Sequence, residues 1–214
     1  KTLNYTGGSD TYHGDFTSAD ATATFGFNSS GTLIMDGTFT GFTGTTTLSG
    51  GTLQFSNATG ANNYLGGDIN LTAGTLSGVT QIAASKTLTY SGGTLTPRSN
   101  TFAVNGTLAF TNAGSITYSD ALTGSGNVTK SGAGTTTLNG TMTGYTGTMS
   151  VNAGTLSLGA NMGGNVSVAG GTLTGSGNIS GTASISSGTY NETGSVGGTV
   201  TASGGTVTTT GAAT

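Results

Sequence analysis

The sequence predicts an all-β protein, a single-stranded right-handed parallel β-helix (β-solenoid) without helices. Three observations lead to this prediction: β-favouring residues alternate in short stretches between glycines, one block of sequence occurs twice, and apolar residues recur every 17 residues. Such stretches are too short for helical periodicity but suit short strands that end in glycine turns. At roughly 20 residues per turn the chain would make about ten turns, and parallel crossovers are nearly always right-handed.

The composition favours an ordered repeat over a disordered or collagen-like chain. The 214 residues are 32% hydrophobic and 5% charged, with a formal net charge of only -3, whereas disordered chains usually carry high net charge. The 42 glycines follow no strict three-residue period and Pro97 is the single proline, which excludes a triple helix. Because there are no cysteines, stability must come from repetition rather than from disulfides.

Charge and hydropathy exclude two classes of partner. The four basic residues are scattered along the chain and leave no electrostatic surface for a nucleic acid: Lys1, Lys86, Arg98 and Lys130. The longest apolar runs are only a few residues, far below the roughly 20 that a membrane-spanning helix needs. We therefore expect neither nucleic-acid binding nor a membrane-spanning segment.

Residues 1–30 are the least repetitive part of the chain. Residues 1–6 alternate and predict a strand, and residues 21–27 (ATATFGF) alternate again and end in two phenylalanines suited to cover a core. We interpret 1–30 as an N-terminal strand and a cap-like lead-in segment, and 31–214 as one continuous solenoid.

An internal duplication lies within the predicted solenoid. Residues 31–55 align without gaps on residues 134–158, and 12 of the 25 positions are identical. The differences preserve side-chain character, since Phe42 corresponds to Tyr145 and Leu48 to Val151. Equivalent aromatic residues in both copies are expected in the core.

A 17-residue ladder extends from 154 to 214. Glycines at 154, 171, 188 and 205 each begin a Gly-Thr-apolar triplet, and stepping by 17 generates four columns. The columns are Leu156, Leu173, Tyr190, Val207; Met162, Ile179, Val196; Val166, Ala183, Val200; and Val168, Ile185, Ala202. Stacked turns of a solenoid require such columns, whereas a hairpin meander does not.

The centre of the chain, residues 51–120, is less regular. Its GTL triplets begin at 51, 74, 93 and 106, so the predicted turns differ in corner length. Pro97 cannot donate to a strand ladder, which places Pro97 and Arg98 at a corner or loop.

The duplicated block resembles the autotransporter-associated β-strand repeat. The resemblance rests on the stretches KSGAGT (130–135), LNG (138–140), GYTG (144–147) and VNAGTL (151–156), with one close copy at 128–158 and a looser copy at 25–55. It implies a right-handed parallel β-helix that is exported to the outside of a bacterium. It implies no particular activity, because passenger regions carry many functions.

No catalytic, cofactor-binding or metal-binding residues are predicted. Carbohydrate-cleaving β-helices need carboxylates and basic groups that converge on one face, and this chain has only seven acids. Glu192 shares a column with Leu158 and Gly175, and we expect it near an exposed edge or corner. His13 has no second histidine or cysteine as a partner, and hydroxyls without a positioned base are poor nucleophiles.

Several local patterns have a structural interpretation beside a functional one. The cluster Asp10, His13, Asp15 and Asp20 contains oxygen ligands of the kind calcium accepts, but solvated turns are the favoured interpretation. The stretch 66–68 (GGD) is a single copy of a calcium repeat that requires tandem copies, so we interpret it as a turn. The stretches 124–126 and 132–134 lack a following helix or a Walker lysine, so we interpret them as corners.

The sequence therefore predicts a non-enzymatic extracellular β-solenoid that serves as a structural stalk, passenger module or adhesive element at a bacterial surface. The last turns, ending in TTTGAAT (208–214), contain no charged or proline-bearing cap, which favours self-association end to end into a filament. The alternative is a carbohydrate-active or glycan-binding β-helix that uses its long face, with a host or matrix glycan as partner. Three or more charged side chains in one cleft would favour that alternative.

Overall fold

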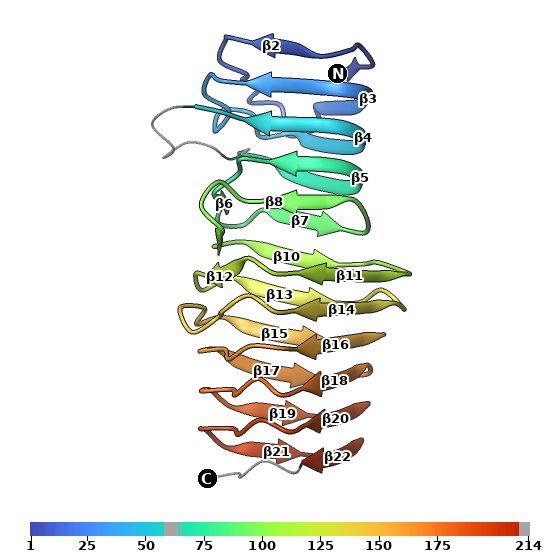
Figure 1. Ribbon diagram of the computed structural model, residues 1–214, viewed down its shortest axis with the longest axis vertical. Coiled ribbons are helices and arrows are strands. Elements are labelled where there is room, and N and C mark those ends of the chain that lie inside the picture. Colours follow the sequence, from blue (N-terminus) through green and yellow to red (C-terminus); the bar gives the residue numbers. More distant parts are fainter. Residues whose placement is uncertain (58–63, 65, 210–214) are drawn as a thin grey trace. The chain divides into compact units, whose positions relative to one another are not determined.

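The protein is a parallel β-solenoid, as the sequence predicts. A computed structural model describes residues 1–57, 64 and 66–209, and these contain strands but no helices. The chain makes about ten turns and divides into two compact units, 1–107 and 108–214. Within each unit, successive turns lie one above another (Figure 1).

The first unit contains two sets of parallel strands. One sheet has the order β1-β3-β4-β5-β7, with β2 paired to β3 and β8 paired to β5, while β6 pairs with β9. The strands are β1 (Thr2–Tyr5), β2 (Asp10–Tyr12), β3 (Thr24–Met35), β4 (Thr45–Phe55), β5 (Asp68–Ser77), β6 (Gln81–Ile82), β7 (Thr87–Tyr90), β8 (Thr94–Thr96) and β9 (Thr101–Val104). The predicted opening strand is confirmed as β1. Pro97 follows the end of β8, as expected for a corner residue.

The long strands β3, β4 and β5 each cover two sides of a turn. Their parallel register shifts near the middle, where the strands bend. Before the bend, Phe27 of β3 aligns with Leu48 and Leu71, and after it Leu33 aligns with Leu53 and Leu76. All of these side chains are buried. Alternating threonines on the same strands lie partly exposed, which accounts for the mixed apolar and threonine sequence.

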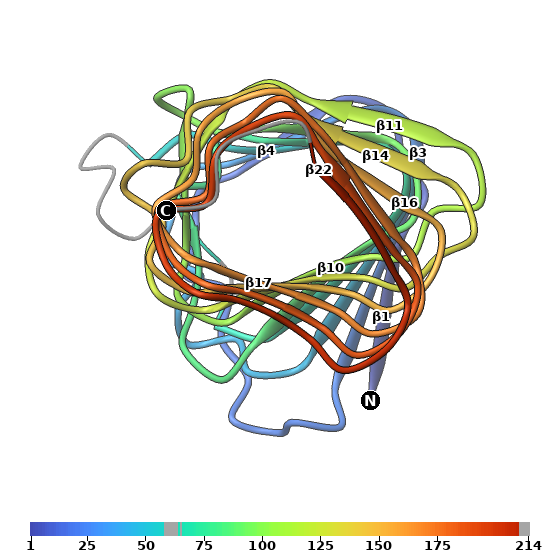
Figure 2. The ribbon, with the colours of Figure 1, turned by 90° about the horizontal axis from the view of Figure 1, so that it is seen from below.

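The second unit has two parallel sheets of regular short strands. The orders are β13-β15-β17-β19-β21 and β11-β14-β16-β18-β20-β22. The strands are β11 (Ser115–Tyr118), β12 (Ala121–Thr123), β13 (Asn127–Lys130), β14 (Thr135–Leu138), β15 (Thr148–Val151), β16 (Thr155–Leu158), β17 (Asn165–Val168), β18 (Thr172–Gly175), β19 (Ala183–Ile185), β20 (Thr189–Glu192), β21 (Val200–Ala202) and β22 (Thr206–Thr209); β10 (Thr107–Phe110) begins at the last residue of the first unit. Viewed along the stack, corresponding strands of successive turns in this unit lie over one another and enclose the interior (Figure 2).

The 17-residue columns are confirmed by the strand register. Leu156 aligns with Leu173, which aligns with Tyr190 and then Val207. The columns that start at Val166 and Val168 follow the same step in the opposite sheet. Isolated parallel bridges join Met162 to Ile179 and Ile179 to Val196 at the corner. Each column therefore supplies one continuous line of the core.

Glycine permits the sharp corners that precede these strands. Gly51 and Gly154, which occupy equivalent places in the duplicated block, have φ values of 64° and 63°. This left-handed conformation is unfavourable for residues with a Cβ atom. A Cβ atom at Gly154 would also lie 2.2 Å from the carbonyl oxygen of Gly132 in the preceding turn.

The duplicated aromatic residues are part of the core, as predicted. Phe42 and Tyr145 are both buried, and each backbone nitrogen donates to the carbonyl oxygen three residues earlier, that of Phe39 and Met142 respectively. Phe25 and Phe27 are also buried. The predicted uncapped stretch 208–214 falls partly on residues 210–214, which lie outside the described residues.

Candidate functional site

The residues of the polar cluster near the N-terminus lie in β2 and the loop after it, and each carboxylate has a different hydrogen-bond partner. Asp10 begins β2, where its Oδ1 accepts a hydrogen bond of 2.8 Å from the backbone nitrogen of Thr11. Asp15 accepts a hydrogen bond from the backbone of Thr38, and Asp20 accepts bonds from the backbone and hydroxyl of Thr22. These hydrogen bonds from Thr22 lower the pKa of Asp20. Asp10 and Asp20 thus accept hydrogen bonds within their own loops, whereas Asp15 accepts one from the next turn of the solenoid.

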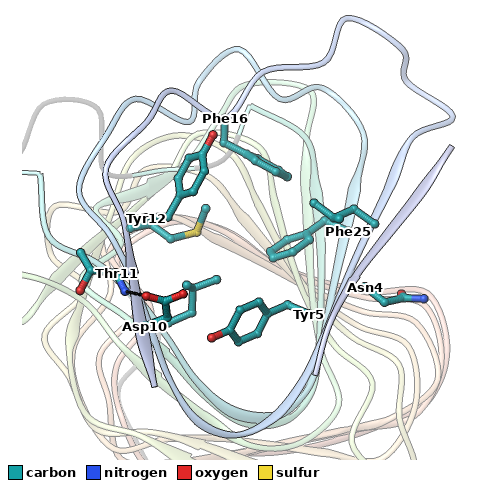
Figure 3. A pocket seen from close by; sticks show the side chains of 10 residues that line it. Asn4, Tyr5, Asp10, Thr11, Tyr12, Phe16 and Phe25 are labelled. Atoms are coloured by element: carbon teal, nitrogen blue, oxygen red, sulfur yellow. Dashed lines mark hydrogen bonds between the residues drawn. The ribbon is translucent and has the colours of Figure 1, made fainter. Parts of the chain in front are cut away.

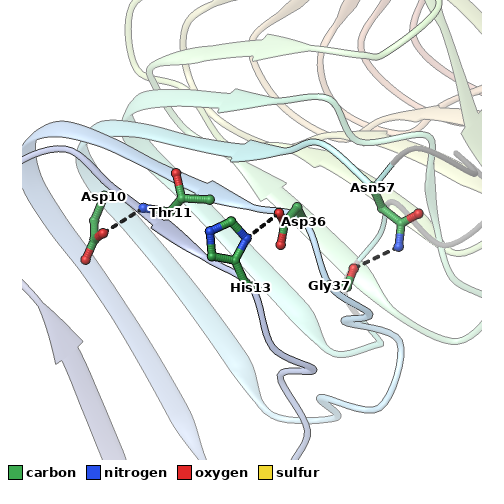
Figure 4. A network of polar contacts seen from close by, with 6 residues as sticks. All are labelled: Asp10, Thr11, His13, Asp36, Gly37 and Asn57. Atoms are coloured by element: carbon green, nitrogen blue, oxygen red, sulfur yellow. Dashed lines mark hydrogen bonds and ion pairs between the residues drawn. The ribbon is translucent and has the colours of Figure 1, made fainter.

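His13 has a partner that sequence proximity did not indicate. Its Nδ1 lies 2.6 Å from Oδ2 of Asp36, and the two residues come from adjacent turns (Figure 4). The parallel register aligns Tyr12 with Met35, so the next residue on each strand brings His13 beside Asp36. The two residues are 23 positions apart, which equals the length of this turn. The irregular N-terminal sequence did not show that length, so the pairing could not be predicted. The histidine side chain is 76% exposed.

An apolar pocket of about 150 Å³ lies among the first strands. Aromatic side chains of Tyr5, Tyr12, Phe16 and Phe25 surround it, and the Asp10 carboxylate lies at its side (Figure 3). The Phe16 and Phe25 rings are 5.1 Å apart between centroids. This pocket exposes the apolar interior of the first turns and contains one charged group, so it lacks the paired acid and base of a hydrolase.

Three further pockets among the described residues are similarly poor in charge. A groove over β1, β3 and β4 is lined by amides, hydroxyls and Phe27, and a second pocket near β5 contains Arg98. A third, beside β1, contains Lys1. Within the described part of the chain, no three His, Cys, Asp or Glu side chains are grouped to hold a metal ion. The same residues include no helix able to cross a membrane.

The glycine-rich stretches form corners. Gly66 and Gly67 precede β5, and Asp68 at the start of that strand accepts a hydrogen bond of 2.8 Å from the backbone nitrogen of Thr87. Residues 124–126 connect β12 to β13, and residues 132–134 connect β13 to β14. None of these connections leads into a helix, so they lack the dipole of a phosphate-binding loop.

Glu192 differs from its predicted environment. The expectation of an exposed edge is wrong, because Glu192 is only 1% exposed and both of its carboxyl oxygens lack a hydrogen-bond partner. The predicted column is nevertheless observed: Leu158, Gly175 and Glu192 align in successive strands. This column faces inward, and burial raises the pKa of Glu192 to about 8.

Lys130 is a second buried ionisable residue that sequence reasoning missed. It occupies the inward column that continues with Val151 and Val168. Its aliphatic stem lies in the core, and its Nζ donates to the carbonyl oxygen of Gly132 at the corner. Burial lowers the pKa of Lys130. The alternation of the strand NVTK was the available signal, since it places Lys130 on the same side as Val128.

Comparison with known proteins identifies a repeat rather than an activity. Residues 28–55 and 128–158 match the family model described as the passenger-associated-transport repeat. The first stretch runs from within β3 to the end of β4, and the second from within β13 to the end of β16. The resemblance to an autotransporter passenger repeat is therefore confirmed at both copies. Comparison with curated proteins and with solved structures finds no match.

Proposed function

We propose that this chain is a non-enzymatic structural module of an exported bacterial surface protein, acting as a stalk or as an adhesive element. The repeat and the β-solenoid fit an autotransporter passenger-like module. The observation that carries the proposal is the coincidence of the two repeat matches with regularly stacked turns of the core. Repetition gives such a module length and rigidity without disulfides.

The exterior of the second unit supports a scaffolding role. The outward positions of β14, β16 and β18 are occupied by Thr or Ser in aligned register, such as Thr137, Ser157 and Thr174. Threonine favours strands and is neutral, so aligned rows avoid the repulsion that identical charges would produce in adjacent turns. A long uncharged surface of this kind suits support or contact with many neutral surfaces.

The dispersal of ionisable groups supports the non-enzymatic part of the proposal. His13 and Asp36 form an exposed pair, and Asp10, Asp15 and Asp20 each accept hydrogen bonds from a different threonine. Each of the four pockets described above contains at most one charged side chain. A hydrolase that uses a general acid together with a general base needs two ionisable groups around one substrate.

The cellular location provides the first test. Antibodies against the purified chain should label intact cells of the producing bacterium, or detect the protein in the medium, without permeabilisation. A cytoplasmic marker protein should remain unlabelled in the same cells. Labelling that requires permeabilisation, with none in the medium, would refute a surface role.

Glycan binding along the long face is the alternative. The supporting observation is the groove over β1, β3 and β4, whose amides and hydroxyls include Asn4, Asn28 and Thr47. Such groups can form hydrogen bonds with neutral sugars. Binding of the purified chain to glycans on an array, abolished by Asn28→Ala but not by the distant Asn105→Ala, would favour this alternative over a purely structural role.

End-to-end self-association is a further part of the proposal. Leu3 of β1 is 54% exposed and Val207 of β22 is 39% exposed, although both project from positions that are buried in neighbouring turns. A second copy that adds a parallel strand at either place would bury these side chains and pair the strand edge. Sedimentation should then show oligomers that weaken in the Leu3→Lys and Val207→Lys variants. A chain that stays monomeric at high concentration would remove filament formation from the proposal.

A further inference from the structure

Glu192 is a carboxyl group enclosed in the core of the second unit. In the parallel register it lies between Gly175 of β18 and Thr209 of β22. Its column contains Leu158 and Gly175 in the two preceding turns, so it contributes no other charged side chain. The side chain is 1% exposed, and neither carboxyl oxygen has a hydrogen-bond partner.

The strands around Glu192 provide no compensating charge. Among the residues that the structure describes, Tyr190 is the titratable residue on the same strand and the same face, and its hydroxyl is also buried without a hydrogen-bond partner. The strands and corner residues packed around this turn contribute only uncharged groups: Leu173 and Gly175 of β18, Val207 and Thr209 of β22, Val166 and Val168 of β17, Ala183 and Ile185 of β19, Val200 and Ala202 of β21, and Ile179 and Val196 at the corner. The buried cation of this unit, Lys130, belongs to β13, and β15 and β17 separate β13 from β19 in the sheet.

The protonation state of Glu192 therefore decides how well this turn packs. Burial of a neutral carboxylic acid costs far less than burial of an ionised one, because the neutral group loses much less hydration energy. An unpaired carboxylate in the same place loses its hydration without compensation. Because every residue of β22 is exposed, the carboxylate reaches water most easily on that side.

We propose that Glu192 is a proton-dependent latch between β20 and β22. When the carboxyl group is protonated, β22 remains stacked on β20 and the core of this turn is closed. When it ionises, β22 separates from β20 and the carboxylate becomes hydrated. The device thus adjusts the local stability of one turn of the second unit to the pH of its surroundings.

The direction of the pH dependence follows from burial. Burial raises the pKa of Glu192 from its ordinary value of 4.5 to about 8. The closed turn therefore holds the proton more tightly than the open turn does. The contribution to stability is fully present below about pH 4.5 and is lost as the pH rises toward 8, so the opening equilibrium increases by up to about tenfold per pH unit in this window.

Hydrogen exchange measured by mass spectrometry tests the latch. Exchange of the β20 to β22 peptides would be followed from pH 5 to pH 9 in the wild type, in Glu192→Gln and in Glu192→Leu, after correction for intrinsic exchange. The wild type should lose protection in these strands with rising pH, while β14 and β16 remain protected. Both variants should keep a constant level of protection. Asp120→Asn, which removes the other carboxylate of this unit, should retain the wild-type profile.

Two results would overturn the proposal. One is equal pH dependence in Glu192→Gln and in the wild type, because the titrating group would then be another residue. The other is pH-independent protection of β20 to β22 in the wild type. A carbon-13 titration of the Glu192 carboxyl in the wild-type chain gives an independent readout, and an ordinary acidic pKa there would equally contradict a closed, protonated latch.

Discussion

At the scale of single residues, Asn112 is a buried polar side chain of the second unit that has several hydrogen-bond partners. Its Nδ2 donates to the carbonyl oxygens of Gly114 and Thr135, at 2.7 and 2.9 Å, and its Oδ1 accepts from the Thr136 hydroxyl at 2.9 Å. The side chain thus joins two successive turns from within the core.

Asn112→Ala should therefore destabilise the second unit. The substitution removes three hydrogen bonds and leaves the buried Thr136 hydroxyl without its acceptor, a change that costs about 1–3 kcal/mol. Asn105→Ala is the control, because Asn105 forms an exposed hydrogen bond with Gln81. Urea unfolding followed by circular dichroism should give a lower midpoint only for Asn112→Ala. Equal midpoints would show that the Asn112 network contributes nothing.

Gly154 and Gly114 show the difference between a glycine that the backbone conformation requires and one that it does not. Gly154→Ala forces a Cβ atom into a left-handed conformation, at a cost of roughly 1–2 kcal/mol, and against the Gly132 carbonyl oxygen. Gly114→Ala should be nearly neutral, because a Cβ atom there has no neighbour within 4 Å. Comparison of the two melting temperatures provides the measurement. If both variants had the same melting temperature, the corner geometry assigned to Gly154 would be wrong.

Residue-level predictions from the sequence succeeded where a column contained several similar side chains. Tyr145 could be assigned to the core because Phe42 occupies the equivalent position in the other copy. Glu192 could not be assigned correctly, since its polarity argued for exposure while its column argued for burial. The column was the better guide. Only Leu158 of that column is apolar, because its next member is Gly175, so the column gave a weak signal of burial.

At the scale of strands, alternation decides which side chains build the core. In β16, Leu156 and Leu158 are fully buried, while Thr155 and Ser157 lie on the outer face. Leu156 aligns with Thr136 in one neighbouring turn and with Leu173 in the other. The strand is thus held by two adjacent strands and by the apolar column.

Shortening a side chain of β16 should lower the free energy of unfolding much more on the inner face than on the outer face. Leu156→Ala leaves a cavity in the column and should cost about 2–5 kcal/mol of unfolding free energy. Ser157→Ala, its immediate neighbour on the outer face, should change stability by no more than about 0.5 kcal/mol. Chemical denaturation of the two variants gives the comparison. A larger loss for Ser157→Ala would mean that the strand faces are reversed.

The regularity of the ladder determined how much of each element could be predicted. From 154 onward the turn length is constant, so the step of 17 residues identified the aligned positions correctly. In the centre, β6 has two residues and the spacing between triplets varies, so no single step could locate it. Corner length depends on contacts between turns, which a single pass along the sequence does not show. The partner of His13 was missed for the same reason.

At the scale of the whole molecule, the sequence predicted architecture more fully than function. A repeated sequence indicates a β-solenoid because each turn contributes one apolar residue to every column of the core. It does not define an activity, because the repeated positions contain mainly apolar residues, threonine, serine and glycine. The proposed structural role rests on the small number of charged residues and on the two passenger-repeat matches.

Parallel stacking of consecutive turns is the central claim, and pyrene fluorescence tests it most directly. The chain has no cysteines, so two cysteines can be introduced and labelled with pyrene maleimide. One double variant carries them at Ser157 and Thr174, and the other at Ser157 and Ser167. Ser157 and Thr174 align in adjacent strands, which are about 4.8 Å apart, whereas Ser167 belongs to the opposite sheet. We expect strong excimer emission from Ser157→Cys/Thr174→Cys and little from Ser157→Cys/Ser167→Cys. The reverse result would indicate β16 and β17 paired as a hairpin and would contradict the solenoid.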